Sequence, residues 1–191
     1  NNDAESHYNN GILFKEEGDY AKAIEEFTTA ISLNPEYMEA YFNRATTWES
    51  KAEFDKGIAD YTKVIELVPD FAGGYNNRGN LWRSKGDNDL AIIDYTKAIE
   101  LLPDFDGFYY SRGNSWFLKN EYTKAIADFS KAVVLNEENA EAFAQLGCSL
   151  YYIKEFDDAI ENLSKAILLN PNFSVAFNVR GQAWNEKKRF D

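Results

Sequence analysis

The chain has 191 residues, of which 45% are hydrophobic and 27% charged, a composition that excludes a disordered chain, and no apolar run is long enough to span a membrane. The formal net charge of −12 disfavours binding to nucleic acids or anionic membranes and favours a protein partner with basic or apolar segments. With one histidine and one cysteine, Cys148, the chain has no intrachain disulfide, no zinc ligand set and no Cys-His pair, so no metal or cofactor is expected.

A register of 34 residues runs through the chain without insertion or deletion. The repeat is clearest in three similar four-residue segments that follow one another at this interval, Asp60-Tyr61-Thr62-Lys63, Asp94-Tyr95-Thr96-Lys97 and Asp128-Phe129-Ser130-Lys131. We therefore expect five complete repeats at residues 4–37, 38–71, 72–105, 106–139 and 140–173, and the first helix of a sixth at residues 174–191. Because the sequence starts at Asn1 and stops at Asp191 inside a helical pattern, it is expected to be part of something longer.

Each complete repeat is predicted to form two helices. Positions 4, 8 and 11 of the repeat share one helical face, as do positions 20, 24 and 27, and the residues at 8 and 20 are always small. Short breaks at Gly18-Asp19, Gly86-Asp87 and Asn120-Glu121 separate the two helices, since Gly and Asn tolerate a left-handed helix end. Four repeats place proline at position 32, where it stops the second helix.

Four tryptophans all fall at position 11, and the pattern as a whole resembles the tetratricopeptide-repeat family, with its 34-residue period. The resemblance covers nearly the whole chain; Glu137 in place of a junction proline is a minor departure. It implies an all-α, right-handed superhelix of antiparallel helix pairs. It also implies a protein-interaction scaffold, not an enzyme, whose concave groove binds a peptide or extended segment through the first helix of each repeat.

The same resemblance assigns repeat positions 2, 5, 6, 9, 12 and 13 to the groove. The polar candidates are Asn9, Asn43, Asn77, Asn80 and Asn114. Such a row of amides could pair with a peptide backbone, as in the similar asparagine ladder of O-GlcNAc transferases, or only with neighbouring backbone. The aromatic candidates are Phe42, Tyr110, Phe117 and Tyr151. They either anchor a partner or cover seams between helices. Cys148 is either reachable from the groove or a small filler.

No base stands at positions 5 or 6, so the carboxylate clamp of some family members is absent and binding to chaperone C-termini is not expected. Two other functions stay open, an assembly module and the accessory domain of a larger enzyme. The sequence names no compartment, and the cytoplasm is only the default expectation.

Two further expectations concern packing. Arg44, Arg78 and Arg112 occur at position 7 in the same repeats that carry Asp at position 23, which predicts partly buried Arg–Asp pairs, with an acid of the same or of the preceding repeat. In the sixth repeat, Phe177 and Trp184 have no second helix to cover them. They are expected to mediate end-to-end self-association or to meet a further helix of a longer natural chain.

Overall fold

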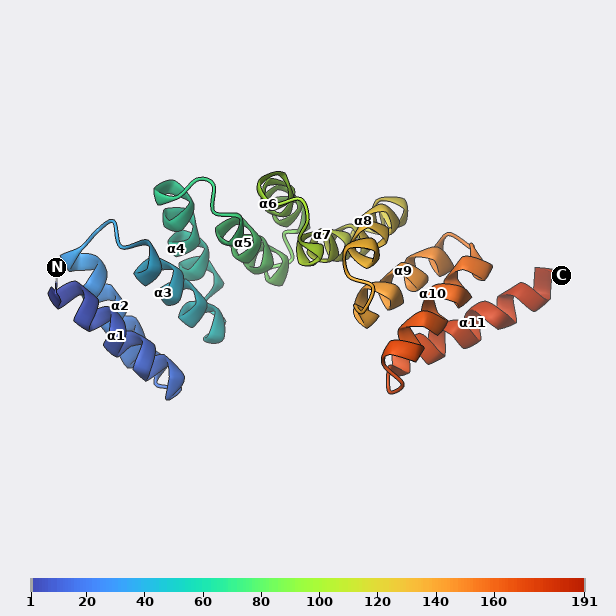
Figure 1. Cartoon of the computed structure of the whole chain (residues 1–191), viewed down its shortest axis with the longest axis horizontal. Helices are drawn as coiled ribbons and strands as arrows, with labels where there is room; N and C mark the ends of the chain where they lie inside the picture. The colour runs from blue at the N-terminus through green and yellow to red at the C-terminus, as the bar shows by residue number, and fades with distance from the viewer. Residues whose placement is uncertain (1, 191) are drawn as a thin grey trace. The chain divides into compact units, whose positions relative to one another are not determined.

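The computed structural model describes residues 2–190, and the side chains of residues 3–188; within this range it contains eleven α-helices and no strand (Figure 1). The helices form two compact units, the first ending at Leu101 and the second beginning at Leu102. The first unit contains α1 (Asn2–Glu16), α2 (Tyr20–Leu33), α3 (Met38–Ser50), α4 (Phe54–Leu67), α5 (Ala72–Ser84) and α6 (Asn88–Leu101). The second contains α7 (Asp106–Leu118), α8 (Tyr122–Leu135), α9 (Ala140–Tyr152), α10 (Phe156–Leu169) and α11 (Ser174–Phe190). The all-α prediction is confirmed.

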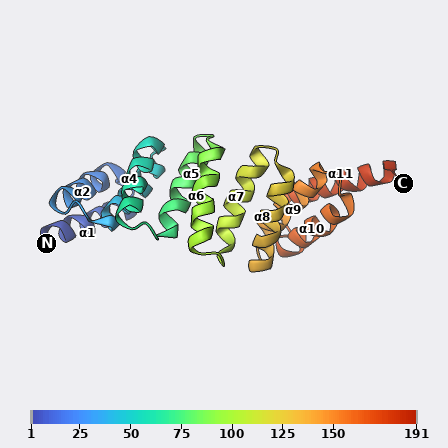
Figure 2. The ribbon, with the colours of Figure 1, turned by 90° about the horizontal axis from the view of Figure 1, so that it is seen from above.

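Within each unit, successive helices pack as antiparallel hairpins, as both ribbon views show (Figures 1 and 2). The hairpins start with α1, α3, α5, α7 and α9, and α11 follows as a single helix without a second helix in the described chain. Five of these helices begin at the first residue of an expected repeat, namely α3, α5, α7, α9 and α11. We call α1, α3, α5, α7, α9 and α11 the first helices.

Small residues allow the two helices of a hairpin to approach closely. A Cβ atom added to Gly79 on α5 would lie 2.9 Å from the ring of Tyr95 on α6, and one added to Gly147 on α9 would lie 2.6 Å from Leu163 on α10. Real Cβ atoms do not pack at such distances, so the large residue of the second helix rests directly on the backbone of the first. This contact explains why each repeat has a small residue at position 8 and a large apolar residue at position 24.

The turn inside each hairpin depends on one left-handed residue. Gly18, Gly86 and Asn120 adopt φ values of 80°, 87° and 60°, as their residue types predict. The structure adds Ala52 and Lys154 at the same repeat position, with φ of 56° and 69°, although neither residue favours this conformation. After Gly18 and Gly86, aspartates accept hydrogen bonds from the backbone N–H groups of the next helix and so cap it.

The predicted Arg–Asp pairs are confirmed, and each pair lies within one hairpin. The Nε and Nη2 atoms of Arg44, Arg78 and Arg112 donate at 2.8 and 2.7 Å to the two carboxylate oxygens of Asp60, Asp94 and Asp128, respectively. All three aspartates are buried. In the first unit, the remaining Nη1 group reaches the preceding hairpin, because Arg44 donates to Thr28 and Arg78 to Thr62. Arg44 and Arg78 thus each tie their own hairpin together and link it to the preceding hairpin.

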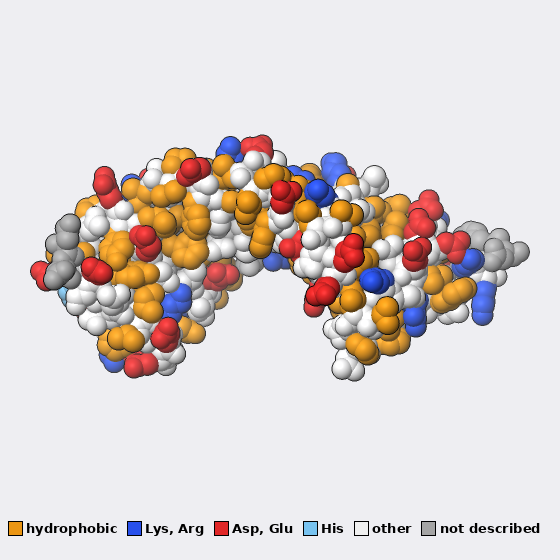
Figure 3. Space-filling view, viewed as in Figure 1, with side chains coloured by type: hydrophobic (Ala, Val, Ile, Leu, Met, Phe, Trp, Pro, Cys, Tyr) orange, Lys and Arg blue, Asp and Glu red, His pale blue; other side chains and the backbone are white. Residues whose placement is uncertain are grey.

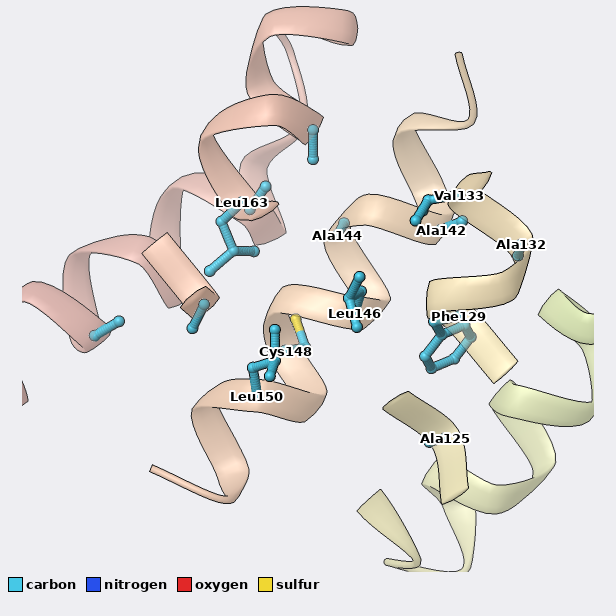
Figure 4. Close-up of a cluster of buried hydrophobic side chains, with 14 residues drawn as sticks. Ala125, Phe129, Ala132, Val133, Ala142, Ala144, Leu146, Cys148, Leu150 and Leu163 are labelled. Atoms are coloured by element: carbon cyan, nitrogen blue, oxygen red, sulfur yellow. The ribbon is translucent and has the colours of Figure 1, made fainter. Parts of the chain in front are cut away.

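The buried core follows the helix pairs. In the second unit, α9 contributes an apolar row that packs between α8 and α10 (Figure 4). Its members are Ala142, Ala144, Leu146, Cys148 and Leu150, which lie between Phe129 and Leu163. Trp48 and Trp116 are partly covered by Lys56 and Lys124 from the second helices, 4.4 and 4.5 Å from their ring centroids. These tryptophans therefore have the packing role that the register implies.

Candidate binding faces on the first helices

The first helices of unit 1 carry a connected polar row. Lys15 on α1 donates to Asn43 Oδ1 at 3.2 Å and to Thr46 Oγ1 at 2.6 Å on α3. The Nδ2 group of Asn43 donates back to the hydroxyl of Tyr8, at 3.1 Å, and to the carbonyl of Glu39. Asn43 is therefore fully engaged in joining α1 to α3, which corresponds to the purely structural reading that the sequence left open.

Two further asparagines, Asn77 and Asn80 on α5, lie against tyrosine hydroxyls from the second helices. Asn77 donates to the Tyr61 hydroxyl at 3.3 Å, and Tyr95 donates to Asn80 Oδ1 at 2.7 Å. Burial raises the pKa of Tyr95 to about 12 and also raises the pKa of Tyr61, so both phenols stay neutral. Among the described residues, the Nδ2 amide of Asn80 has no hydrogen-bond partner, so its donors can serve a ligand.

Three charged residues on this face were missed by the sequence reasoning, namely Lys15, Glu49 and Arg83. All occupy position 12, the position at which Phe117 and Tyr151 were chosen as aromatic candidates, so extending that choice to charged residues would have found them. Desolvation raises the pKa of Glu49 and lowers that of Lys15, while the attraction between the two charges opposes both shifts. Within the described chain, no ion pair involves Glu49, whose side chain is exposed.

Arg83 follows Asn80 by one turn of α5. Burial raises the pKa of the Tyr95 phenol, and the positive charge of Arg83 opposes this shift. Its Nε atom is buried and has no hydrogen-bond partner in the part of the chain that the structure describes. A buried donor without an acceptor costs about 1–3 kcal/mol and calls for an explanation, and a functional role is one such explanation. Asn80 and Arg83 on α5 and Glu49 on α3 thus keep polar atoms without a hydrogen-bond or ion-pair partner among the described residues, and we call these three residues the polar group.

The face of unit 2 is mainly aromatic. Tyr122 and Tyr152 stack with ring centroids 4.7 Å apart, and Phe117 contacts both edge-on at 5.4 and 5.6 Å. Tyr152 is 54% exposed, whereas Tyr151 is half-buried against Phe156. A shallow groove beside this cluster is lined by Tyr151, Tyr152, Lys154, Phe156 and Glu186. Tyr152 stands at position 13, one of the expected groove positions, whereas Tyr122 and Phe156 were not among the sequence candidates because they lie on the second helices.

Of the remaining sequence candidates, three pack against other side chains and one is exposed. Phe42 lies between Tyr61 and Phe71, at 5.5 and 5.7 Å, and therefore covers a seam between helices. Tyr110 packs on Phe129 at 5.9 Å. Asn114 is only 9% exposed and accepts a hydrogen bond from Gln145 at 3.1 Å. Asn9 is exposed on α1.

His7 and Cys148 both have structural surroundings. His7 Nδ1 lies 2.6 Å from the Glu26 carboxylate, so the histidine replaces arginine as the partner of the position-23 acid in the first repeat. Cys148 is 6% exposed, and burial raises the pKa of its thiol to about 11. Among the described residues, no three His, Cys, Asp or Glu side chains are grouped to hold a metal ion, and no helix is long and apolar enough to cross a membrane.

Phe177 and Trp184 lie on α11, with 45% and 46% of their surfaces exposed. Their helix packs against α9 and α10.

Comparison with known proteins identifies the family. A profile described as tetratricopeptide repeat matches residues 72–105 and 140–173, and one described as TPR repeat matches residues 11–47 and 113–152. The chain belongs to the tetratricopeptide-repeat (TPR) family, whose members serve as protein-interaction scaffolds, and its fold is an all-α TPR-like solenoid. No curated protein matches the sequence significantly.

Solved structures support the same fold. A tetratricopeptide repeat protein from Parabacteroides merdae ATCC 43184 aligns with a TM-score of 0.86 at 19% identity, over 96% of this chain and 73% of that one. MamA from Desulfovibrio magneticus RS-1 aligns with a TM-score of 0.84 at 17% identity, over 91% and 98%. YrrB, described as a TPR protein with an unusual peptide-binding site, aligns at 0.80 and 18%, over 94% and 92%. At these identities the likeness shows the fold alone.

Proposed function

We propose that this chain, with five complete repeats at residues 4–173, is a scaffold that binds a peptide or an extended protein segment on the first helices. The observation that carries the proposal is the polar group of Asn80, Arg83 and Glu49, which combines a free amide donor, a buried donor without acceptor and an exposed carboxylate without an ion pair. The proposal assigns binding, not catalysis, to the chain.

The chemistry of this group indicates what it would bind. An amide donor suits a backbone carbonyl, and a rotation of Arg83 towards the same segment would relieve its unpaired Nε atom. The Glu49 carboxylate, in a partly desolvated position, suits a lysine or arginine of the partner. A bound segment would therefore present carbonyl groups and a basic side chain. In unit 2, the exposed Tyr152 ring and the neighbouring groove offer apolar contacts of the kind that anchor partners.

The test starts from short random peptides displayed on phage and selected against the full chain. A selected peptide is then titrated against the wild type and against Asn80→Ala, Arg83→Ala and Glu49→Gln. Each substitution is expected to weaken binding several-fold. Glu49→Gln is expected to leave the melting temperature nearly unchanged, because no ion pair is lost, whereas Asn80→Ala removes the acceptor of the buried Tyr95 hydroxyl and is expected to lower it. Glu66→Ala, on the exposed side of α4, is the matched control.

Asn43 provides an internal contrast. Asn43→Ala removes hydrogen bonds that join α1 to α3, and so it is expected to lower stability more than Asn80→Ala does. If Asn80→Ala, Arg83→Ala and Glu49→Gln changed peptide affinity no more than Glu66→Ala, the polar group would not be the binding site.

A further inference from the structure

Two buried polar atoms of unit 1 have no hydrogen-bond partner in the described part of the chain. One is the Nε donor of Arg83, near the end of α5, and the other is the Oδ1 acceptor of Asn88, the first residue of α6. Among the residues whose side chains the structure describes, no other buried side-chain nitrogen or oxygen lacks a partner. One hairpin therefore holds both an unsatisfied donor and an unsatisfied acceptor, on either side of its turn, and each of them destabilises the fold.

The repeat places these two residues next to each other. Arg83 stands at position 12 and Asn88 at position 17. In the two hairpins of unit 2, the residues at these positions are in ring contact, Phe117 with Tyr122 at 5.4 Å and Tyr151 with Phe156 at 5.9 Å. The hairpin of α5 and α6 turns through a left-handed residue at the same repeat position as those hairpins do. The donor and the acceptor thus belong to one small region at the end of the hairpin.

Asn88 differs from the residues at position 17 of the other complete repeats, which are all aromatic, namely Tyr20, Phe54, Tyr122 and Phe156. A packed ring has no carbonyl oxygen to satisfy, whereas the carboxamide of Asn88 brings an acceptor into a buried place. Its Nδ2 group reaches the Gly86 carbonyl only at 3.5 Å, which is a weak contact. Asparagine at this position therefore costs stability within the fold, and a ligand that supplied the missing partners would recover it.

The missing partners describe a chemical group that carries an acceptor and a donor side by side. A primary carboxamide does so, because its oxygen can accept from Arg83 Nε while its NH2 group donates to Asn88 Oδ1. One trans peptide unit cannot do both, because its C=O and N–H point in opposite directions. Both atoms are buried although their residues are partly exposed, so the end of a side chain can reach them where a backbone cannot follow.

An acidic side chain fits this region less well than a carboxamide. Arg83 would attract a carboxylate, but Asn88 Oδ1 would then face a second acceptor. Burial raises the pKa of the Tyr95 phenol, the charge of Arg83 opposes this shift and the charge of Glu49 adds to it, so both charged groups act on the same hydroxyl. Asp and Glu side chains are also spread over the part of unit 1 that is visible in Figure 3. A neutral carboxamide avoids repulsion by these acids.

We propose that Arg83 and Asn88 form a subsite for a glutamine or asparagine side chain of the bound segment. The Nε–H group of Arg83 donates to the carboxamide oxygen, and Asn88 Oδ1 accepts from the carboxamide NH2 group. The inference rests on the proposed function, because it assigns one side chain of the segment that the polar group binds. It adds Asn88 as a residue that determines specificity.

The probes are peptides selected by phage display on the full wild-type chain and, in parallel, on the variant Asn88→Leu. Glutamine or asparagine is expected to be enriched at one position only in the wild-type selection. One glutamine-containing peptide is then synthesised with glutamate or methionine in place of the glutamine, and calorimetric titration compares the three. Each replacement is expected to weaken binding to the wild type about tenfold, because it leaves at least one of the two buried atoms unpaired.

Protein variants show whether Asn88 causes this preference. With Asn88→Leu, the preference for glutamine over methionine is expected to fall to about twofold or less, because the acceptor is gone. The matched control is Asn172→Leu, which makes the same chemical change at an exposed residue in the turn before α11. It is expected to keep both the affinity and the preference of the wild type.

The melting temperature gives a readout that needs no peptide. Asn88→Leu removes an unpaired buried acceptor, so its melting temperature is expected to equal or exceed that of the wild type. A clear fall would overturn the proposal, because Asn88 would then have a partner in the free protein, either Arg83 itself or a bridging water.

The peptide-binding proposal and this inference fail separately. If Glu49→Gln and Asn80→Ala weaken peptide binding while the glutamine can be replaced without loss, or while Asn88→Leu keeps the preference, the subsite is refuted and the peptide-binding proposal stands. If the variants of the polar group leave the affinity unchanged, the peptide-binding proposal fails, and the subsite fails with it.

Discussion

At the scale of single residues, one backbone position decides how each hairpin turns. The fifteenth residue of every repeat adopts a left-handed conformation, although only three of the five are Gly or Asn. Gly18, Gly86 and Asn120 identify the turn from residue type alone. Ala52 and Lys154 do not, and their conformations are imposed by the helices on either side, which must close at the same place in every repeat.

Replacing Ala52 by glycine should therefore stabilise the protein. A left-handed L-residue costs about 1–2 kcal/mol, whereas the extra unfolded-state freedom of glycine costs about 0.4–1 kcal/mol, which leaves a net gain of about 0.5–1 kcal/mol. Urea unfolding measures the change. The control is Ala59→Gly, exposed within α4, which should lose about 1 kcal/mol. Equal losses in the two variants would show that Ala52 carries no strain.

At the scale of helices, hairpins are held by polar pairs as well as by apolar packing. The co-occurrence of Arg and Asp within repeats predicts the pairs, and the structure selects the acid of the same repeat over that of the preceding one. The choice follows from geometry: the same-repeat acid receives both Nε and Nη2, while the preceding hairpin offers a threonine to Nη1. The position-23 acid of the first repeat binds His7 instead.

Breaking one Arg–Asp pair should be costly. Arg78→Met leaves the buried Asp94 carboxylate without its partner, and we expect a loss of about 3 kcal/mol. The double variant with Asp94→Leu should lose clearly less than the sum of the two single losses, because no unpaired charge remains. For comparison, Lys63→Ala breaks an exposed pair with Glu66 and should cost less than about 1 kcal/mol. If the loss in the double variant equalled the sum of the two single losses, the coupling between Arg78 and Asp94 would be contradicted.

The close approach of paired helices gives a second test at this scale. Gly79→Leu places a large side chain where even a Cβ atom would lie 2.9 Å from the Tyr95 ring, so we expect a loss of about 1–3 kcal/mol. Gly181→Leu makes the same chemical change on an open helix face. Thermal unfolding of both variants compares them directly, and an equal effect at the two sites would contradict the difference in packing.

At the scale of the whole molecule, charge limits the choice of partner. The 32 acidic residues against 20 basic ones give the chain a negative field that attracts basic segments and repels phosphates.

The affinity of selected peptides should therefore depend on salt. Basic peptides should bind more weakly as the salt concentration rises, since charges are screened over about 10 Å at 0.1 M salt. Apolar peptides of the same length, which serve as the control, should change little. Titration at low and high salt measures the difference. Duplex DNA should not bind at physiological salt, and tight binding of DNA would contradict this account of the field.

The sequence by itself determined the helix pairs, three of the five turns and the presence of Arg–Asp pairs. These features follow from periodicity and residue type within one repeat, where the interacting residues are close along the chain. Only the tertiary structure decided which candidates are free to bind. Asn43 and Asn114 are occupied by neighbouring helices, Asn80 keeps a free amide, and Gly181 stays uncovered. The physical reason is that availability depends on the side chains that other helices bring to the same place, and no single repeat specifies them.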